Sequence, residues 1–130
     1  MDRLVAGMKR KVLIPPRDLF GNLYEIFEPA SIPATEIHDL DKLVRDPRVT
    51  VMMITYNHER YVRGAIESIL AQQCDFPIEI IIGDDCSTDN ARQVLLDYQQ
   101  KYPEIIRLIF HKQNIGLAAN WATCVKACKG

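Results

Sequence analysis

Three short segments in the middle of the chain carry side chains that could bind a ligand. Residues 55–59 read Thr-Tyr-Asn-His-Glu, residues 83–90 include the adjacent carboxylates Asp84 and Asp85, and residues 114–116 read Asn-Ile-Gly. An aromatic ring and a hydroxyl suit stacking on, and hydrogen bonding to, a flat nucleobase. Ionised carboxylates beside a buried strand cost desolvation energy unless ligand hydroxyls, base N–H groups, backbone amides or a metal satisfy them. The three segments are therefore candidates for one binding site.

Each segment also has an ordinary structural explanation. Thr55 or Asn57 could cap a helix with Tyr56 packed at its base, and this explanation is favoured when the first segment is taken alone. Asp89 suits the acidic N-terminus of a helix, whereas the two carboxylates before it fit that role less well. Asn and Gly at 114–116 are common turn residues. The hypothesis of a ligand-binding site therefore depends on the three segments lying close to one another in the fold.

The cysteines and histidines do not show a metal-ligand spacing. They lie at Cys74, Cys86, Cys124, Cys128, His38, His58 and His111. Cys124 and Cys128 are four residues apart, but a zinc site needs a second closely spaced pair, which the other two cysteines do not supply. We expect the cysteines to be small buried side chains. The sequence does not favour a catalytic Cys–His pair and does not exclude one.

Alternating strands and helices must position the three segments. Apolar runs predict strands, and apolar residues at helical spacing predict helices, in the order 49–54, 62–70, 78–82, 91–98, 105–110 and 117–128. This β-α-β-α-β-α order with short connections predicts a mostly parallel sheet covered by helices, a three-layer α/β/α fold. Ligands bind outside the carboxyl ends of such strands, which is where all three segments lie.

The sequence changes character near residue 47. Five of the seven prolines lie before Arg48, in a region without sustained periodicity. We expect 1–47 to be a Pro-rich N-terminal extension and 48–130 to be the α/β domain. Within the extension, 12–14 is a candidate strand and both 19–27 and 35–44 are candidate helices, docked on the domain or on a partner.

Composition excludes several classes of function. The 130 residues include 16 basic and 17 acidic side chains, giving a formal net charge of −1. This balance does not indicate nucleic-acid or anionic-lipid binding. No apolar run approaches the roughly 18 residues of a membrane span, and no secretion signal is apparent. We therefore expect no transmembrane segment and a cytoplasmic location. The glycine patterns of dinucleotide folds and P-loops are also absent.

Four motifs occur in a fixed order between residues 49 and 130. They are Thr55-Tyr56-Asn57, the helix pattern Ala65-Ile66-Glu67-Ser68-Ile69-Leu70-Ala71-Gln72, then Asp84-Asp85-Cys86-Ser87-Thr88-Asp89, and finally Asn114-Ile115-Gly116. Together they resemble the N-terminal, nucleotide-binding half of a family 2 glycosyltransferase, which has the GT-A (Rossmann-like) fold. Ile54 stands where that family usually has proline. Ala119-Asn120 replaces a later Arg-Asn, which puts a basic contact to the donor phosphates in doubt.

The resemblance implies transfer of a sugar from a nucleotide-diphospho-sugar donor to the hydroxyl of a glycan or lipid-linked acceptor. Such hexosyltransferase chemistry serves polysaccharide biosynthesis. The implied nucleotide-sugar-binding residues are Thr55, Tyr56, Asn57, Glu59, Asp84, Asp85 and Asn114. Tyr56 would lie against the base, Asp85 would accept a hydrogen bond from its ring N–H, and Asp84 would support the site. Glu59 and Asn114 are the weaker candidates, at the pocket rim.

The family pattern continues beyond these motifs with a metal-binding acidic motif and a catalytic base. The resemblance therefore implies a Mn²⁺ or Mg²⁺ ion whose ligands, like the catalytic residues, would lie beyond Gly130. We expect 48–130 to be a half-domain truncated after the third βα unit, and the 130-residue chain alone to be inactive. The alternative is a stand-alone nucleotide-binding or protein-interaction module. Peripheral attachment at the inner face of the membrane, and a homo-oligomer formed through a sheet edge or the extension, are further expectations.

Overall fold

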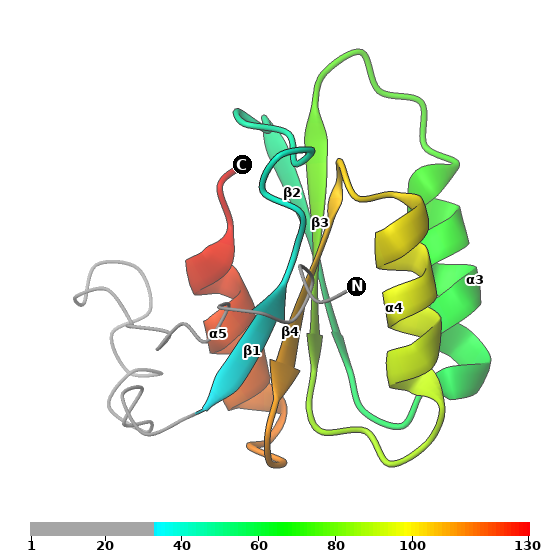
Figure 1. Cartoon of the computed structure of the whole chain (residues 1–130), viewed down its shortest axis with the longest axis vertical. Coiled ribbons are helices and arrows are strands. Elements are labelled where there is room, and N and C mark those ends of the chain that lie inside the picture. Colours follow the sequence, from blue (N-terminus) through cyan, green and yellow to red (C-terminus); the bar gives the residue numbers. More distant parts are fainter. Residues whose placement is uncertain (1–32) are drawn as a thin grey trace.

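The computed structural model describes residues 33–130, so the candidate strand at 12–14 and the candidate helix at 19–27 lie outside the described residues. The elements are β1 (Ala34–Ile37), β2 (Val49–Thr55), α3 (Glu59–Leu70), β3 (Ile78–Asp84), α4 (Ala91–Lys101), β4 (Ile106–His111) and α5 (Leu117–Ala127) (Figure 1). The predicted strands and helices after residue 48 are confirmed, with bounds that differ by a few residues.

The four strands form one sheet in the order β1-β4-β3-β2. β2 pairs parallel with β3, and β3 pairs parallel with β4, because each connection between them is a helical crossover. β1 joins the outer edge of β4 in the antiparallel sense. Helices α3 and α4 cover one face of the sheet, and α5 covers the other (Figure 1). The predicted three-layer α/β/α fold with a mostly parallel sheet is confirmed.

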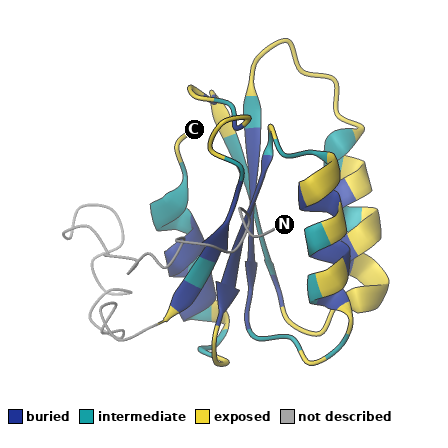
Figure 2. Ribbon diagram, viewed as in Figure 1, coloured by how far each residue is buried: buried dark blue, intermediate teal, exposed yellow. Residues whose placement is uncertain are grey.

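The run of isoleucines in β3 shows why this strand is central. Ile80 and Ile82 pack in the core beneath α3 and α4, whereas Ile81 packs with Cys124 of α5 on the opposite face. All three isoleucines are fully buried, because successive side chains of a strand point to opposite faces and both faces are covered. Burying each contributes about 1.5–3 kcal/mol, so β3 anchors both layers (Figure 2).

The predicted helix at 35–44 is wrong. Its first residues form β1, in which Thr35 pairs with Phe110 and Ile37 with Leu108 of β4. Helical spacing would place Leu40 with Ile37 and Val44 on one apolar face, but Leu40 is 64% exposed. The segment forms a strand because its backbone N–H and C=O groups pair with the otherwise open edge of β4, and this tertiary pairing outweighs the local spacing.

A buried ion-pair cluster fastens β1 to the sheet. Arg107 of β4 donates from Nε to Oε1 of Glu36 in β1 at 3.1 Å and from Nη1 to Oε2 of Glu79 in β3 at 2.9 Å. Burial alone would raise the pKa of Glu36, but the His38 ring, whose Nδ1 lies 3.5 Å from Oε1, and the Arg107 guanidinium lower it to about 2. The cluster therefore holds β1 in register by charge pairing across three strands.

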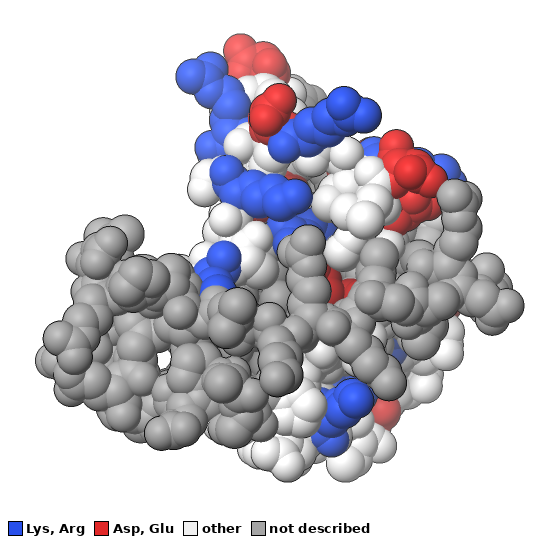
Figure 3. Space-filling model, turned by 60° about the vertical axis from the view of Figure 1, so that its left-hand side comes forward, with Lys and Arg blue, Asp and Glu red and all other residues white. Residues whose placement is uncertain are grey.

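The surface of the described region is mixed in charge. On the face shown in Figure 3, Lys and Arg side chains lie beside Asp and Glu side chains, in keeping with a formal net charge of −1. None of the helices between residues 33 and 130 has the length and apolar character needed to cross a bilayer.

Candidate functional site

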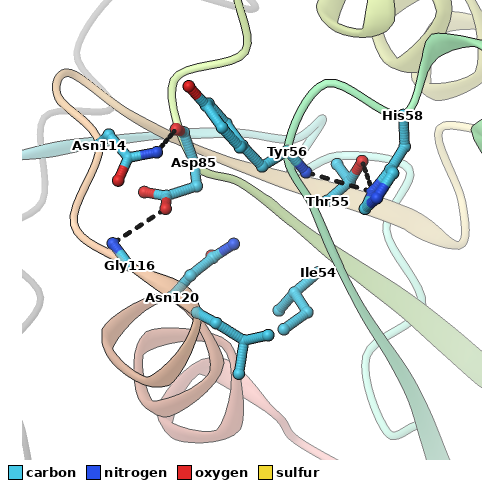
Figure 4. Close-up of a pocket in the computed structure, with 9 residues that line it drawn as sticks. Ile54, Thr55, Tyr56, His58, Asp85, Asn114, Gly116 and Asn120 are labelled. Carbon is cyan, nitrogen blue, oxygen red and sulfur yellow. Dashed lines mark hydrogen bonds between the residues drawn. The ribbon is translucent and has the colours of Figure 1, made fainter.

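An open pocket of about 400 Å³ lies where β2 and β3 end, beside the N-terminus of α5 (Figure 4). This volume falls within the roughly 300–1,000 Å³ of small-molecule sites. Its lining consists of Ile54, Thr55, Tyr56, His58, Asp85, Asn114, Gly116, Leu117 and Asn120. Four of the seven residues predicted from the sequence thus line one pocket: Thr55, Tyr56, Asp85 and Asn114.

Asp85 is held at the floor of the pocket by backbone amides. One carboxylate oxygen accepts the N–H of Ile115 at 2.7 Å, and the other accepts the N–H of Gly116 at 2.9 Å. Both amides precede α5, where the helix dipole favours negative charge. The residue is only 3% exposed, so its position is well defined. Each oxygen keeps further lone-pair capacity for a ligand N–H or O–H.

Asp84 does not line the pocket. Its Oδ2 accepts a hydrogen bond from Nε of Arg92 at 2.6 Å and another from the N–H of Ser87 at 2.9 Å. The Ser87 hydroxyl donates to Oδ1 at 2.5 Å. These groups satisfy a carboxylate that has no exposed surface. The structure therefore places Asp84 behind the site, where it shapes the loop after β3.

Asn57 and Glu59 join neighbouring loops and do not line the pocket either. Asn57, with a φ of 54° that asparagine tolerates, accepts the N–H of Thr88 at 2.8 Å. Glu59 accepts the N–H of Asn90 at 2.6 Å, and Asp89 accepts the N–H of Glu59 at 3.1 Å. These reciprocal hydrogen bonds fix the starts of α3 and α4 against each other, so both residues act on the pocket only through the backbone.

His58 is a pocket residue that the sequence prediction missed. Its Nδ1 lies 3.2 Å from Oγ1 of Thr55 and 3.4 Å from the backbone N of Tyr56. Because the Tyr56 N–H is a donor, Nδ1 is the acceptor there and Nε2 carries the proton. Tyr56 is 43% exposed, so its ring can stack on a planar ligand. The only sequence signal for His58 is its position directly after the Thr-Tyr-Asn motif.

Asn120 is a second missed residue. Its Nδ2 donates to the carbonyl of Gly83 at 3.0 Å. Its Oδ1 therefore faces Nε2 of His111 at 3.0 Å and accepts a hydrogen bond from the N–H there. Burial lowers the pKa of His111, which favours this neutral tautomer. A Cβ on Gly83 would overlap Oδ1 of Asn120 and Sγ of Cys124. Glycine at 83 therefore lets α5 approach β3 closely enough to bring Asn120 to the pocket.

The other pocket residues that the sequence prediction did not include form the walls and rim of the pocket. Gly116 has a φ of 89°, a backbone conformation that favours glycine, and this turn presents its N–H to Asp85. Leu117 is 74% exposed at the rim, and Ile54 contributes the apolar wall from β2. The pocket therefore combines apolar walls with a few convergent polar groups, the usual character of a site for an organic ligand.

The described residues do not fit a divalent cation on their own. Between residues 33 and 130, the His, Cys, Asp and Glu side chains form no group of three or more that could hold a metal ion. Asp84 faces the Arg92 guanidinium, and both oxygens of Asp85 face N–H donors. The guanidinium and the amide N–H groups present positive charge to these carboxylates, which disfavours a cation beside them.

Comparisons with known proteins agree with this architecture. Residues 50–130 match the family model described as glycosyl transferase family 2. An uncharacterized Mycobacterium bovis protein, Mb1547, is 38% identical over 82 residues, which are 63% of this chain and 24% of that protein. The chain thus spans about a quarter of the length of this curated relative.

Two solved structures share the fold. A mannosyltransferase from Pyrobaculum calidifontis, PcManGT in complex with GDP-Man and Mn²⁺, aligns with a TM-score of 0.56 and 25% identity over 65% of this chain and 25% of that chain. Residues 1–349 of S. aureus TarS, in complex with UDP-GlcNAc, align with a TM-score of 0.51 and 31% identity over 63% of this chain and 24% of that chain.

Proposed function

The chain belongs to glycosyl transferase family 2, and from this premise we propose that it supplies the donor-nucleotide half of a sugar transferase. The reaction would move a sugar from a nucleotide-diphospho-sugar to the hydroxyl of a glycan or lipid-linked acceptor. The observation that carries the proposal is the pocket in which the exposed Tyr56 ring stands beside the anchored Asp85 carboxylate. The division into an extension at 1–47 and a nucleotide-binding half at 48–130 belongs to the same proposal.

The chemistry of the pocket supports a nucleobase as its occupant. A stacked aromatic ring contributes about 1–3 kcal/mol per base and is tolerant of base type. Uracil and guanine each carry a ring N–H beside a carbonyl, and a carboxylate such as that of Asp85 is a suitable acceptor for it. The two structural neighbours bind GDP-Man and UDP-GlcNAc, which contain these bases.

The other polar groups of the pocket suit the sugar part of a nucleotide. The side-chain amide of Asn114 donates to the backbone carbonyl of Asp85 at 3.3 Å, which leaves its Oδ1 as an acceptor for a ribose hydroxyl. The Thr55 hydroxyl lies beside Nδ1 of His58 and can exchange this contact for one with a ligand. We propose that these groups orient the nucleoside while the open side of the pocket admits the diphosphate.

Sugar transfer also needs a base that deprotonates the acceptor hydroxyl and a positive group that neutralises the leaving diphosphate. In family members a divalent cation supplies that positive charge when bound. Because the described residues do not fit such a cation, we assign them donor binding alone. We therefore expect the 130-residue protein to bind nucleotides but to transfer no sugar.

Nuclear magnetic resonance titration tests the proposal directly. UDP, GDP and ADP are added to the ¹⁵N-labelled protein, with and without Mg²⁺. We expect UDP or GDP to shift the amide signals of residues 54–56, 85 and 114–117, with ADP much weaker because adenine lacks a ring N–H donor. Unchanged spectra with UDP and GDP at millimolar concentration would contradict the proposal. Shifts confined to a different surface would place the nucleotide elsewhere.

A further inference from the structure

Arg92 lies behind the pocket and bridges the ends of two strands. Located in the first turn of α4, it donates from Nε to Oδ2 of Asp84 at 2.6 Å, where β3 ends. Its Nη2 donates to the backbone carbonyl of His111 at 2.5 Å, where β4 ends. The guanidinium carbon lies 4.6 Å from the centre of the Phe110 ring, a cation–π contact that packs the group against β4. One side chain therefore fixes the spacing of two strand ends.

The same arginine reaches the end of β2 through a short chain of hydrogen bonds. The Asp84 carboxylate that it pairs with also accepts the N–H and the hydroxyl of Ser87. The Ser87 Oγ in turn accepts the N–H of Asn57 at 3.0 Å. Asn57 directly follows Tyr56, the aromatic residue of the pocket. Arg92 is thereby connected to the loop that presents this ring.

On the other side, the His111 carbonyl that Arg92 holds starts the loop of residues 112–116. This loop supplies Asn114 and the two amides that anchor Asp85. Arg92 itself lies among the residues that cover the α4 face of the sheet, whereas the pocket opens on the α5 face. It therefore does not line the pocket, and any effect on a ligand must pass through these loops.

We propose that Arg92 is a positioning residue for the donor nucleotide, which holds the loops after β2, β3 and β4 at the spacing that brings Tyr56 and Asp85 together. This inference rests on the proposed function of the pocket. A planar guanidinium binds two acceptors through two separate nitrogens held in fixed directions, whereas the donors of a lysine ammonium share one nitrogen and rotate freely. The arrangement therefore requires arginine specifically.

A purely structural role is the competing explanation, and Arg63, a surface arginine that joins two helices, provides the control. Arg63 of α3 donates to the hydroxyl of Tyr98 at 3.4 Å and lies 5.5 Å from the centre of that ring. It thus joins two elements by a hydrogen bond and a cation–π contact, as Arg92 does. Its contacts lie between α3 and α4 and do not include a pocket loop.

The experiment measures the Kd of UDP and GDP, and unfolding by urea, for the wild-type chain, Arg92→Ala, Arg92→Lys and Arg63→Ala. We expect Arg92→Ala to raise Kd at least about tenfold, equivalent to about 1.4 kcal/mol. Arg92→Lys should recover part of the stability but little of the affinity. Arg63→Ala should bind as tightly as wild type even if it loses as much stability. Millimolar methylguanidinium should restore binding to Arg92→Ala and leave Arg63→Ala unchanged.

The outcomes separate the two proposals. If wild type binds and Arg92→Ala binds equally well, the positioning role is overturned while the proposed function stands. The role is also overturned if Arg63→Ala loses as much affinity as Arg92→Ala. If wild type binds neither nucleotide, both proposals fall. Should Arg92→Ala fail to fold, Arg92→Lys carries the test, because it keeps the charge and the aliphatic stem; wild-type affinity in that variant would overturn the role.

Discussion

The carboxylates of Asp84 and Asp85 are adjacent in the chain but point to opposite faces of the sheet. Asp84 pairs with Arg92 of α4, and Asp85 accepts amide N–H groups at the start of α5. Alternation along an extended chain produces this arrangement, because the two helices cover opposite faces. One carboxylate thus orders the loops, and the other faces the pocket.

The close approach of α5 to β3 gives the first prediction. Gly83→Ala should destabilise the protein by about 1–3 kcal/mol, because the new Cβ overlaps Asn120 and Cys124 and pushes α5 outward. Gly64→Ala is the control: it lies in α3 with open space around its Cβ and should stabilise by about 0.5–1 kcal/mol. Urea unfolding measures both. Equal effects of the two substitutions would contradict the packing described for α5.

The cluster around Arg107 predicts a dependence of stability on pH. Glu36 has a folded-state pKa of about 2 against a usual value of 4.5, because His38 and Arg107 outweigh the opposing effect of burial. A lowered folded pKa stabilises the protein above pH 4.5, and this contribution is lost as the pH falls towards 2. The difference corresponds to about 3 kcal/mol. The pKa of Glu79 is shifted in the same direction.

Urea unfolding at a series of pH values checks this prediction. The free energy of unfolding should fall steeply between pH 4.5 and 2 in the wild-type chain. In Glu36→Gln the overall stability should be lower and the slope shallower, since the substituted side chain does not titrate. Asp75→Asn, on an exposed loop, should keep the wild-type slope. A slope that Glu36→Gln leaves unchanged would show that Glu36 does not pair as described.

Thiol reactivity provides a third prediction. Cys124 is fully buried, and burial raises the pKa of its thiol to about 12, whereas Cys74 is exposed. The thiolate is the reactive form, so iodoacetamide at pH 8 should label Cys74 quickly and spare Cys124 until urea unfolds the chain. Peptide mass mapping reads the result. Native-state labelling of Cys124 at a rate near that of Cys74 would mean that α5 does not pack stably on the sheet.

The parallel core could be predicted because its signals are local. The apolar run of 78–82 and the polar segments after each strand place the strand ends, and with them the pocket, without tertiary information. β1 could not be predicted in this way, since Thr35 pairs with Phe110, far along the chain. A four-residue strand acquires its conformation from that partner.

The sequence alone could not predict which site residues line the pocket and which only hold the loops, because this depends on tertiary structure. Strand alternation indicates that Asp84 and Asp85 diverge, but the positions of α4 and α5 decide which of the two faces the pocket. Asn57 and Glu59 follow a strand as a ligand-binding residue would, yet their partners are the loop amides before α4. Asn120 enters the pocket because Gly83 allows the helix to approach.

If Asp85 and the surrounding pocket bind the base of a donor nucleotide, isothermal titration calorimetry with UDP and GDP should detect the binding and its dependence on Asp85. Wild type, Asp85→Ala and the exposed-loop control Asp75→Ala are compared, with circular dichroism confirming that each is folded. We expect saturable binding of UDP or GDP by wild type and Asp75→Ala, and an affinity at least about tenfold weaker in Asp85→Ala, equivalent to about 1.4 kcal/mol. Undiminished affinity in folded Asp85→Ala, or no binding by wild type at millimolar nucleotide, would contradict this role of Asp85 and the pocket.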